Sequence, residues 1–221
     1  VIGFTDLVLK TNLNETQHQY LSIVNQSGNA LLSIINDILD FSKIEAGRLE
    51  LDVDKCDLYE MCSQATDIIT YQIQSKGLEM LLNISNDLPR FVYGDSVRLK
   101  QILVNLLGNA SKFTEKGEIE LKVECLGAKG DLHKIRFSVR DTGIGIKAEK
   151  QSKIFEAFSQ EDSSTTKKYG GTGLGLTISN SLLRLMDSKL ALESKLGEGS
   201  TFYFDVELKT EEGDAIAWVD V

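Results

Sequence analysis

Four glycines lie within six residues in the stretch Gly170-Gly-Thr-Gly-Leu-Gly175, and an apolar-periodic segment follows it directly. Glycine loses more conformational freedom on folding than any other residue, so the cluster indicates a need for bare backbone. A glycine turn that opens a helix offers unpaired N–H groups and the positive end of the helix dipole, which together suit a bound phosphate. Isolated clusters are as often plain turns or helix caps, and the spacing matches neither a P-loop nor a dinucleotide fingerprint. The stretch therefore predicts a phosphate site only in combination with other residues.

A second group of candidate residues lies on the helix that Asp95 or Ser96 is expected to cap. Its apolar positions recur at helical spacing: Leu99, Ile102, Leu103, Leu106, Leu107, Ala110 and Phe113. Beside this stripe, within about 60° of one another, fall the side chains of Arg98, Asn105, Asn109 and Lys112. Two amides and two cations along one edge of a half-buried helix suit a metal ion and phosphate oxygens. The alternative is a solvated polar face, which such residues more often form on a helix that stands alone.

The third candidate is Asp141, at the end of the second of two predicted strands. Ile119 to Cys125 and Ile135 to Val139 alternate apolar with polar residues, and a hairpin turn is expected over Gly127 to Asp131. Continuing that alternation by one step places Asp141 on the core side. A carboxylate aimed inward needs a hydrogen-bond donor, and the exocyclic amine of a purine would serve. The alternative is an ordinary turn aspartate before the glycines that follow it.

Between this aspartate and the glycine stretch lies a segment with little apolar periodicity. Phe155 and Phe158 fall within residues 154–160, which look exposed, and residues 161–169 are rich in Ser, Thr and Lys. A polar segment of this kind beside a glycine loop predicts a mobile lid that is hinged on the glycines.

The elements that position these groups follow from the hydrophobic period. Strands are predicted over Leu49 to Val53, Met80 to Ile84, Phe91 to Tyr93, Lys189 to Ser194 and Thr201 to Leu208. Helices are predicted over Leu58 to Gln74 and Leu174 to Met186. We therefore expect one domain of strands and helices over residues 51–209, followed by a linker over residues 210–221.

Residues 1–50 are predicted to form a helical hairpin with a turn at residues 11–14. Small or apolar residues of the second helix recur at steps of three and four: Leu21, Val24, Gly28, Leu31, Ile35, Ile38 and Ser42. A seam of this length calls for a partner helix, so two hairpins are expected to form a four-helix dimer core. The alternative is a bundle within one chain. Gly47 ends the second helix, and the change of period after it predicts a domain boundary near residue 50.

Composition narrows the classes of partner and location. The 221 residues carry a formal net charge of −9, which disfavours nucleic acid and anionic membrane as partners, because both bind basic surfaces. No stretch of about 18 consecutive apolar residues is present, so no transmembrane helix is predicted, and no signal peptide is recognisable. The three cysteines, Cys56, Cys62 and Cys125, form no CxxC pair and are typical of reduced cytosolic thiols, so we expect a cytoplasmic chain without direct membrane contact. The chain begins with Val1 rather than methionine, which favours a piece of a longer protein.

Taken together, the motifs form an ordered set. The Asn-x-x-x-Asn helix is followed by Asp141-Thr-Gly-Ile-Gly145, then by the glycine stretch, then by Gly197-Glu-Gly-Ser-Thr201. This set closely resembles the ATP-binding catalytic domain of sensor histidine kinases, with its N, G1, F and G2 boxes. Residues 1–47, which include Asp40-Phe-Ser-Lys-Ile-Glu-Ala-Gly47, resemble the second half of that family's dimerisation and histidine phosphotransfer hairpin. The nearest likeness is to the large hybrid kinases fused to receiver domains.

The resemblance implies an α+β fold, a Bergerat-type α/β sandwich whose mixed sheet is covered by helices, preceded by a helical hairpin. It implies that Asp141 holds the adenine amine and that Asn109 ligates Mg²⁺. The catalytic residues it implies near the phosphates are Arg98, Asn105 and Lys112. Gly143 and Gly145 would admit the purine closely, and the other residues implied to bind ATP are Ile146, Phe155, Phe158, Lys168, Tyr169, Gly171, Thr172, Gly173, Leu174, Gly175, Leu176 and Thr201. The implied cofactors are ATP and Mg²⁺, and the implied partners are a second copy, through residues 1–50, and a response-regulator receiver domain.

The family's phosphate-accepting histidine lies in a His-[Glu/Asp]-x-x-[Thr/Asn]-Pro motif that this chain lacks. Its two histidines are His18, which precedes Gln19 rather than an acid, and His133 beside the hairpin turn. We therefore expect nucleotide binding without self-phosphorylation at the usual site. Two alternatives stay open. One is an ATP-hydrolysing relative, disfavoured because Asn105 stands where those enzymes carry a general-base glutamate; the other is a non-catalytic dimerisation module that has lost ATP binding.

Overall fold

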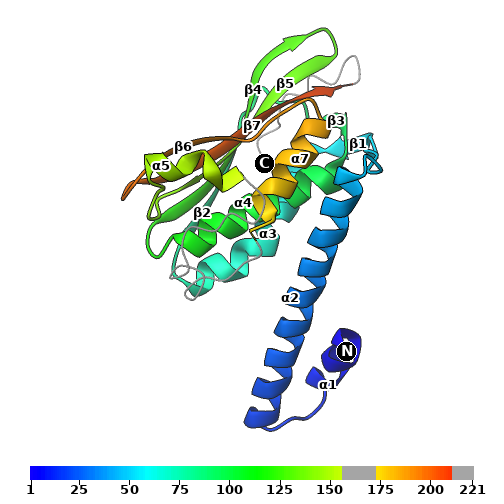
Figure 1. Cartoon of the computed structure of the whole chain (residues 1–221), viewed down its shortest axis with the longest axis vertical. Coiled ribbons are helices and arrows are strands. Elements are labelled where there is room, and N and C mark those ends of the chain that lie inside the picture. The colour runs from blue at the N-terminus through cyan, green and yellow to red at the C-terminus, as the bar shows by residue number, and fades with distance from the viewer. Residues whose placement is uncertain (156–172, 211–221) are drawn as a thin grey trace. The chain divides into compact units, whose positions relative to one another are not determined.

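The amino-terminal hairpin begins its long helix at a capping box. In the computed structural model, which describes residues 1–155 and 173–210, α1 spans Ile2–Leu9 and α2 spans Glu15–Glu45 (Figure 1). The Asn14 side chain accepts the Gln17 N–H at 2.8 Å, and the Gln17 side chain accepts the Asn14 N–H at 3.1 Å. Two donors of the first turn are thereby satisfied. The predicted helical hairpin is confirmed.

The exposed apolar residues of α2 and the apolar character of the helices in general limit what the helices can contact. Several apolar residues of the predicted α2 seam are exposed on the single chain: Val24, Leu31, Ile35 and Ile38. A helix with such a stripe buries it against a partner helix. Within residues 1–155 and 173–210, no helix combines the length and the apolar character needed to cross a bilayer.

The chain divides after Leu49 into a second compact unit, Glu50–Val221, which is built on a mixed sheet. Its strands are β1 (Asp54–Asp57), β2 (Glu79–Ile84), β3 (Phe91–Gly94), β4 (Glu118–Lys129), β5 (Leu132–Asp141), β6 (Ala191–Lys195) and β7 (Gly199–Lys209). Its helices are α3 (Leu58–Ser75), α4 (Ser96–Phe113), α5 (Ala148–Gln151), the 3-10 helix η1 (Lys153–Phe155) and α7 (Gly175–Leu185). The strand order is β1-β3-β7-β5-β4-β2, with β6 also paired to β7. β2 and β4 are parallel, and the other described pairs are antiparallel.

One face of this sheet holds the core. The central strands bury alternate residues there: Ile119, Leu121, Val123, Ile135, Phe137, Val139, Phe202, Phe204, Val206 and Leu208. Phe137 and Phe204 stack with their ring centroids 5.1 Å apart. Helices α3, α4 and α7 lie across this face (Figure 1) and bury their own apolar stripes against it. The predicted architecture, a mixed sheet covered by helices, is confirmed.

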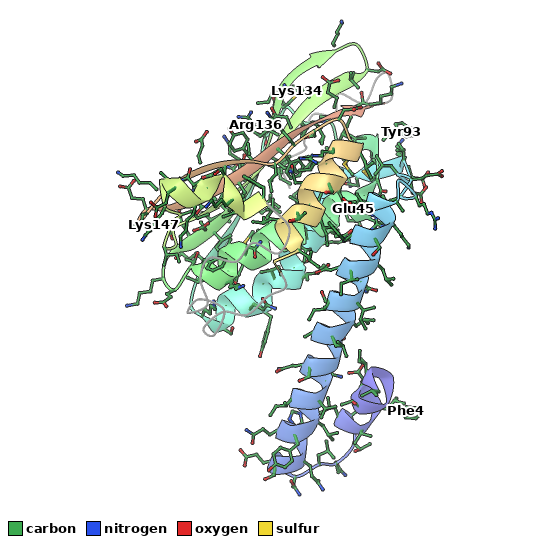
Figure 2. All side chains as sticks on the ribbon, viewed as in Figure 1. Phe4, Glu45, Tyr93, Lys134, Arg136 and Lys147 are labelled. Carbon is green, nitrogen blue, oxygen red and sulfur yellow. The ribbon has the colours of Figure 1, made fainter. Side chains whose placement is uncertain are left out.

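The opposite face carries charged side chains that pair across the strands. On β5, Arg136 donates to Asp205 of β7 at 2.7 and 3.0 Å, and its guanidinium lies 4.6 Å from the ring centroid of Tyr203 (Figure 2). Lys122 and Glu124 form a further ion pair along β4. Exposed pairs of this kind each contribute little to stability, about 0–1 kcal/mol.

One predicted strand is misplaced. The alternation over Leu49 to Val53 predicts a strand, but β1 begins only at Asp54. A strand needs a ladder partner, and the four residues of β3 pair with Asp54–Asp57 alone. The segment before β1 is held instead by the Asp52 N–H, which donates to Asp95 Oδ2 at 3.0 Å.

The predicted hairpin turn is too long. The structure continues the ladder to the pair Lys129 and Leu132, so the turn consists of Gly130 and Asp131. Gly130 has a φ of +63°, the left-handed conformation that two-residue hairpin turns require. A register shift between Cys125 and Gly127 accommodates the extra residue as a β-bulge.

Candidate functional site

Helix α4 begins at a buried aspartate and carries four of the candidate residues. Asp95 accepts the Arg98 N–H at 2.9 Å through Oδ1, while its Oδ2 accepts the Asp52 N–H. A capping carboxylate with both oxygens occupied fixes the start of the helix, and therefore the direction of the polar edge that follows. The Arg98 guanidinium donates to Gln101 Oε1 at 2.7 Å within the first turns.

Asn105 lies where α4 meets the start of α7. Its amide nitrogen donates to Ser179 Oγ at 2.9 Å. A Cβ atom on Gly175 would lie 2.3 Å from Asn105 Oδ1, so a glycine is needed for this approach. Asn105 therefore holds the amino-terminal end of α7 against α4. Among residues 1–155 and 173–210, no side chain caps α7, and the first backbone N–H groups of an α-helix have no partner within the helix itself.

Asn109 and Lys112 are half-buried further along the same helix edge. The hydrogen bonds among the described residues engage the amide of Asn105 but not that of Asn109. Burial lowers the pKa of Lys112, whose Nζ lies 5.0 Å from the centroid of the Phe113 ring. An uncommitted amide and a partly desolvated cation on one edge suit phosphate oxygens, because low solvation strengthens charged hydrogen bonds.

Asp141 is only 7% exposed and lies on the core side of β5, where the alternation of the strand predicts it. Its Oδ1 accepts the Gly143 N–H at 2.8 Å. Burial raises the pKa of this carboxyl above its ordinary value, and backbone hydrogen bonds from Gly143 and Ser200 partly offset that effect. A carboxylate has about four acceptor positions, so Asp141 retains capacity for a ligand donor. Desolvated carboxylates of this kind are concentrated at functional sites.

The glycines after Asp141 are required by contacts within the protein itself. A Cβ atom on Gly143 would lie 2.4 Å from the Phe113 carbonyl oxygen. One on Gly145, whose φ is +66°, would lie 2.0 Å from the Lys195 carbonyl oxygen. The lack of side chains at Gly143 and Gly145 therefore lets this loop pack between the end of α4 and the β6–β7 turn. The resemblance implied only that these glycines leave room for a purine. Ile146 lies beside it, and its N–H donates to Ser194 Oγ at 2.8 Å.

The remaining predicted residues lie partly outside the described ones. Phe158, Lys168, Tyr169, Gly171 and Thr172 fall within residues 156–172, as does the predicted lid. Gly173 has a φ of +71°, a conformation that favours glycine, and Leu174 is buried at the start of α7. The Thr177 hydroxyl donates to the Phe155 carbonyl at 3.4 Å and so links η1 to α7. Leu176 and Thr201 are half-buried, Thr201 opposite Arg140 on β7.

Several residues that hold the site together carry no sequence signal. Ser179 and Ser194 bond to site elements, but single serines in a helix or a strand form no spacing pattern. Thr114 is completely buried, and its hydroxyl is without a partner among the residues described. It follows Phe113, whose carbonyl accepts the Ile144 N–H at 3.3 Å. An unsatisfied buried hydroxyl costs about 1–3 kcal/mol, so Thr114 is an energetically unfavourable feature beside the loop that follows Asp141.

The α4 edge is compatible with a magnesium ion that also binds substrate oxygens, since Asn109 offers an amide oxygen there. The described residues contain no cluster of three or more His, Cys, Asp or Glu that would hold a metal ion by itself. Mg²⁺ does not need one, because it keeps several waters and binds through one or two protein oxygens together with phosphates. The Asn109 amide oxygen, on the edge that also carries Lys112, is suited to that role.

The fold and this arrangement of amides, glycines and a buried aspartate define an ATPase-type α/β sandwich, and comparison with known proteins agrees. Residues 94–210 match the family model described as "Histidine kinase-, DNA gyrase B-, and HSP90-like ATPase". Residues 1–47 match the His Kinase A (phospho-acceptor) domain. The chain therefore belongs to the histidine kinases within this ATPase family. The predicted family and its Bergerat-type fold are confirmed.

Individual relatives agree with this assignment. The signal transduction histidine-protein kinase BarA of Escherichia coli (strain K12) is 45% identical over 94% of this chain, which spans 23% of BarA. Full-length ShkA in complex with AMPPNP superposes with a TM-score of 0.77 at 35% identity, covering 95% of this chain and 42% of ShkA. Histidine kinase ThkA in complex with the response regulator protein TrrA gives a TM-score of 0.64 at 25% identity, covering 96% of this chain and 57% of that one.

Proposed function

We propose that residues 51–209 bind Mg²⁺·ATP and transfer its γ-phosphoryl group to a histidine on a dimerisation helix, for relay to an aspartate of a response-regulator receiver. The observation that carries this proposal is the buried Asp141 on the same face as the polar edge of α4. An adenine amine supplies the donor that a desolvated carboxylate needs. The ShkA complex with AMPPNP, a nucleotide, supports the same ligand class.

Each candidate residue has a proposed role. Asp141 accepts the adenine amine, and the glycine-containing loop after it, Gly143 to Ile146, lines the base. Asn109 ligates Mg²⁺, which when bound neutralises phosphate charge. Lys112 and Arg98 contribute positive charge, and Asn105 holds α7 so that its first N–H groups face the phosphates. The residues proposed around the triphosphate and the lid are Phe155, Phe158, Lys168, Tyr169, Gly171, Thr172, Gly173, Leu174, Gly175, Leu176 and Thr201.

These residues act by positioning and charge rather than by covalent chemistry. In phosphoryl transfer, a histidine nitrogen forms a bond to the γ-phosphorus while the bond to the leaving oxygen of ADP breaks. Negative charge on the phosphoryl oxygens is stabilised by cations and N–H donors that are already in place. Lys112 and the first N–H groups of α7 are proposed as such donors, and neither role requires a general base.

Residues 1–50 are proposed to supply the dimer contact, and the α2 seam supports this because several of its apolar residues are exposed. The ThkA complex with a response regulator protein supports a receiver domain as the downstream partner. Residues 210–221 are proposed as a linker to a further domain. This role sets the chain in the cytoplasm, where ATP is available.

An ATP-hydrolysing enzyme of the same family is the second candidate function. Asn105 argues against it, since an amide cannot take a proton from water and this one is hydrogen-bonded to Ser179. The buried Asp141 disfavours a non-catalytic module. Desolvation of a carboxylate costs free energy, which a bound nucleotide would offset by donating a hydrogen bond.

Phosphoryl transfer is tested in a longer chain that carries the histidine motif ahead of residue 1. With γ-labelled ATP and Mg²⁺ we expect label on that chain that is lost in acid and kept in alkali, and none on the 221-residue chain. A His→Gln substitution in the motif is the matched control. Acid-stable label would indicate a different acceptor, and release of free phosphate by the 221-residue chain would favour hydrolysis.

A further inference from the structure

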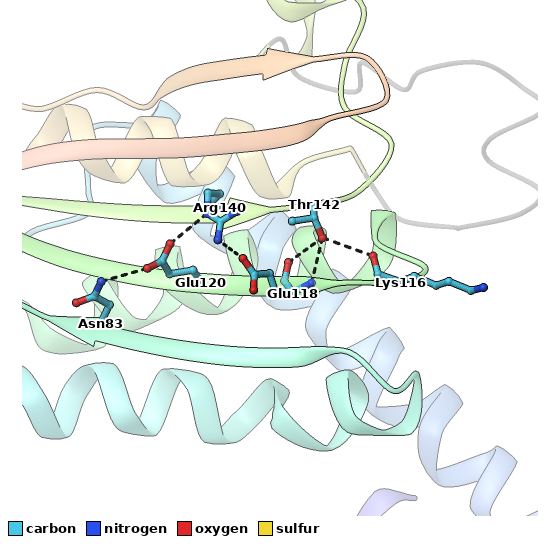
Figure 3. A network of polar contacts seen from close by, with 6 residues as sticks. All are labelled: Asn83, Lys116, Glu118, Glu120, Arg140 and Thr142. Atoms are coloured by element: carbon cyan, nitrogen blue, oxygen red, sulfur yellow. Dashed lines mark hydrogen bonds and ion pairs between the residues drawn. The ribbon is translucent and has the colours of Figure 1, made fainter.

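The residues on either side of Asp141 face away from the candidate site. Successive side chains of a strand alternate between the two faces of the sheet, so Arg140 and Thr142 lie on the outer face while Asp141 is buried. Both contact one residue of the neighbouring strand, Glu118 at the start of β4 (Figure 3). The two residues that flank Asp141 in the sequence are therefore both bonded to Glu118.

Arg140 joins the end of β5 to two carboxylates. Its guanidinium donates to Glu118 through Nη2 and to Glu120 Oε2 through Nε at 3.1 Å. Glu120 also accepts from the Asn83 side chain of β2 at 3.2 Å, so one network crosses three strands (Figure 3). A guanidinium that binds two carboxylates at once fixes direction as well as charge.

Thr142 adds hydrogen bonds one residue beyond the strand. Its Oγ1 accepts the Glu118 N–H at 3.0 Å, and its own N–H donates to the Glu118 carbonyl at 3.2 Å. A Cβ atom on Gly117, whose φ is +110°, would lie 2.2 Å from this hydroxyl. The close approach of Thr142 to β4 therefore depends on a glycine opposite it.

These contacts occur at the carboxyl end of β5 on the side of β4, while on the other side Asp141 pairs with Ser200 of β7. Asp141 is the last residue of β5, and the ladder to β4 ends at its pair with Ile119. Ends of strands open at low free-energy cost, which would blur the direction of a terminal side chain. We name the side chains of Arg140, Thr142, Glu118 and Glu120 the outer-face clamp, because they hold this end from the side opposite the site.

We propose that the outer-face clamp sets the affinity for adenine, with Arg140 and Thr142 acting as positioning residues for Asp141. This inference rests on the proposed function, because it assumes that Asp141 accepts the adenine amine. The clamp lies on the face of the sheet opposite Asp141. Loosening it is therefore expected to weaken the contribution of the amine while the rest of the nucleotide binds as before.

The test compares two arginines of the same strand and face. Arg140→Met removes the ion pairs of the clamp, whereas Arg136→Met removes a similar ion pair, with Asp205, at a position earlier on β5 and so further along the strand from Asp141. For each folded variant, calorimetry gives the dissociation constants of Mg²⁺·ATP and of purine ribonucleoside triphosphate, which lacks the 6-amino group. The dissociation constant of purine ribonucleoside triphosphate divided by that of ATP measures how much the 6-amino group contributes to affinity. We expect Arg140→Met to reduce that ratio about fivefold and Arg136→Met to leave it unchanged.

A second pair of variants keeps the test independent of the arginines. Thr142→Val removes the hydroxyl with little change of shape and is expected to reduce the same ratio, and Thr142→Ser to restore it. An unchanged ratio in Arg140→Met and Thr142→Val, or an equal loss in Arg136→Met, would overturn the clamp alone. If the unsubstituted chain bound both nucleotides equally, or neither, the proposed role of Asp141 would fail and this inference with it.

Discussion

Asp141→Asn is expected to weaken ATP binding by about 2–3 kcal/mol, or about 30- to 150-fold, because a hydrogen bond to a charged acceptor is lost. Oδ1 of Asp141 already accepts the Gly143 N–H, so the asparagine would keep its oxygen there and turn its amide nitrogen toward the adenine amine. A donor would then face a donor. Calorimetric titration with Mg²⁺·ATP measures the loss.

The control for this variant is a ligand rather than a second substitution. Purine ribonucleoside triphosphate has no 6-amino group, so its affinity is expected to be nearly the same for the unsubstituted chain and for Asp141→Asn. An equal loss for both nucleotides would show that the substitution damages the fold of the site, and equal retention of ATP would exclude Asp141 as the acceptor.

The raised pKa of Asp141 gives the same contact a pH dependence. Burial is the main cause of the shift, so the carboxyl takes up a proton at a higher pH than an exposed aspartate does. ATP affinity is expected to fall as the pH decreases through this raised pKa, and Asp141→Asn to lack that step. The pH dependence of folding stability has the opposite sign. Because the folded pKa lies above the unfolded one, the contribution of Asp141 to the free energy of unfolding increases as the pH falls through the same window.

Asn109→Ala is expected to abolish the effect of Mg²⁺ on ATP binding and to lower phosphoryl transfer, in the longer chain, about 100-fold or more. The reason is that Asn109 provides the one amide of the α4 edge that no described residue engages, whereas the Asn105 amide is bonded to Ser179. Titrations with ATP in the presence of Mg²⁺ and of EDTA measure the metal dependence directly.

Asn86→Ala is the matched control for Asn109→Ala, because Asn86 is an exposed asparagine in the turn between β2 and β3. It is expected to keep both the affinity and the metal dependence of the unsubstituted chain. A metal dependence that survives in Asn109→Ala would move the ligand role to another residue. The fold of each variant is checked by its thermal unfolding midpoint.

Much of the fold follows from the sequence because local periods determine which side chains are buried. The two-residue period of β5, extended one step, predicts the burial of Asp141. The 3.6-residue period of α4 predicts its apolar stripe, and Asp95 predicts where it begins. These features need no knowledge of the neighbouring elements.

Features that depend on a distant partner could not be predicted in this way. The alternation over Leu49 to Val53 is typical of a strand, but the backbone of β3 pairs with Asp54–Asp57 instead. The hydrogen bond from Asn105 to Ser179 joins residues 74 positions apart, and no pattern in either segment predicts it. The outer-face clamp was missed for the same reason, since Arg140 and Glu118 look like ordinary exposed charges until the strands are paired.

Binding of Mg²⁺·ATP is the property on which the proposed function depends, and a calorimetric titration of the 221-residue chain measures it. We predict a single-site isotherm with a dissociation constant in the micromolar to millimolar range, dependent on Mg²⁺ and at least about tenfold tighter than that of purine ribonucleoside triphosphate. Absence of binding by the folded chain at several millimolar ATP would show that the proposed function is wrong.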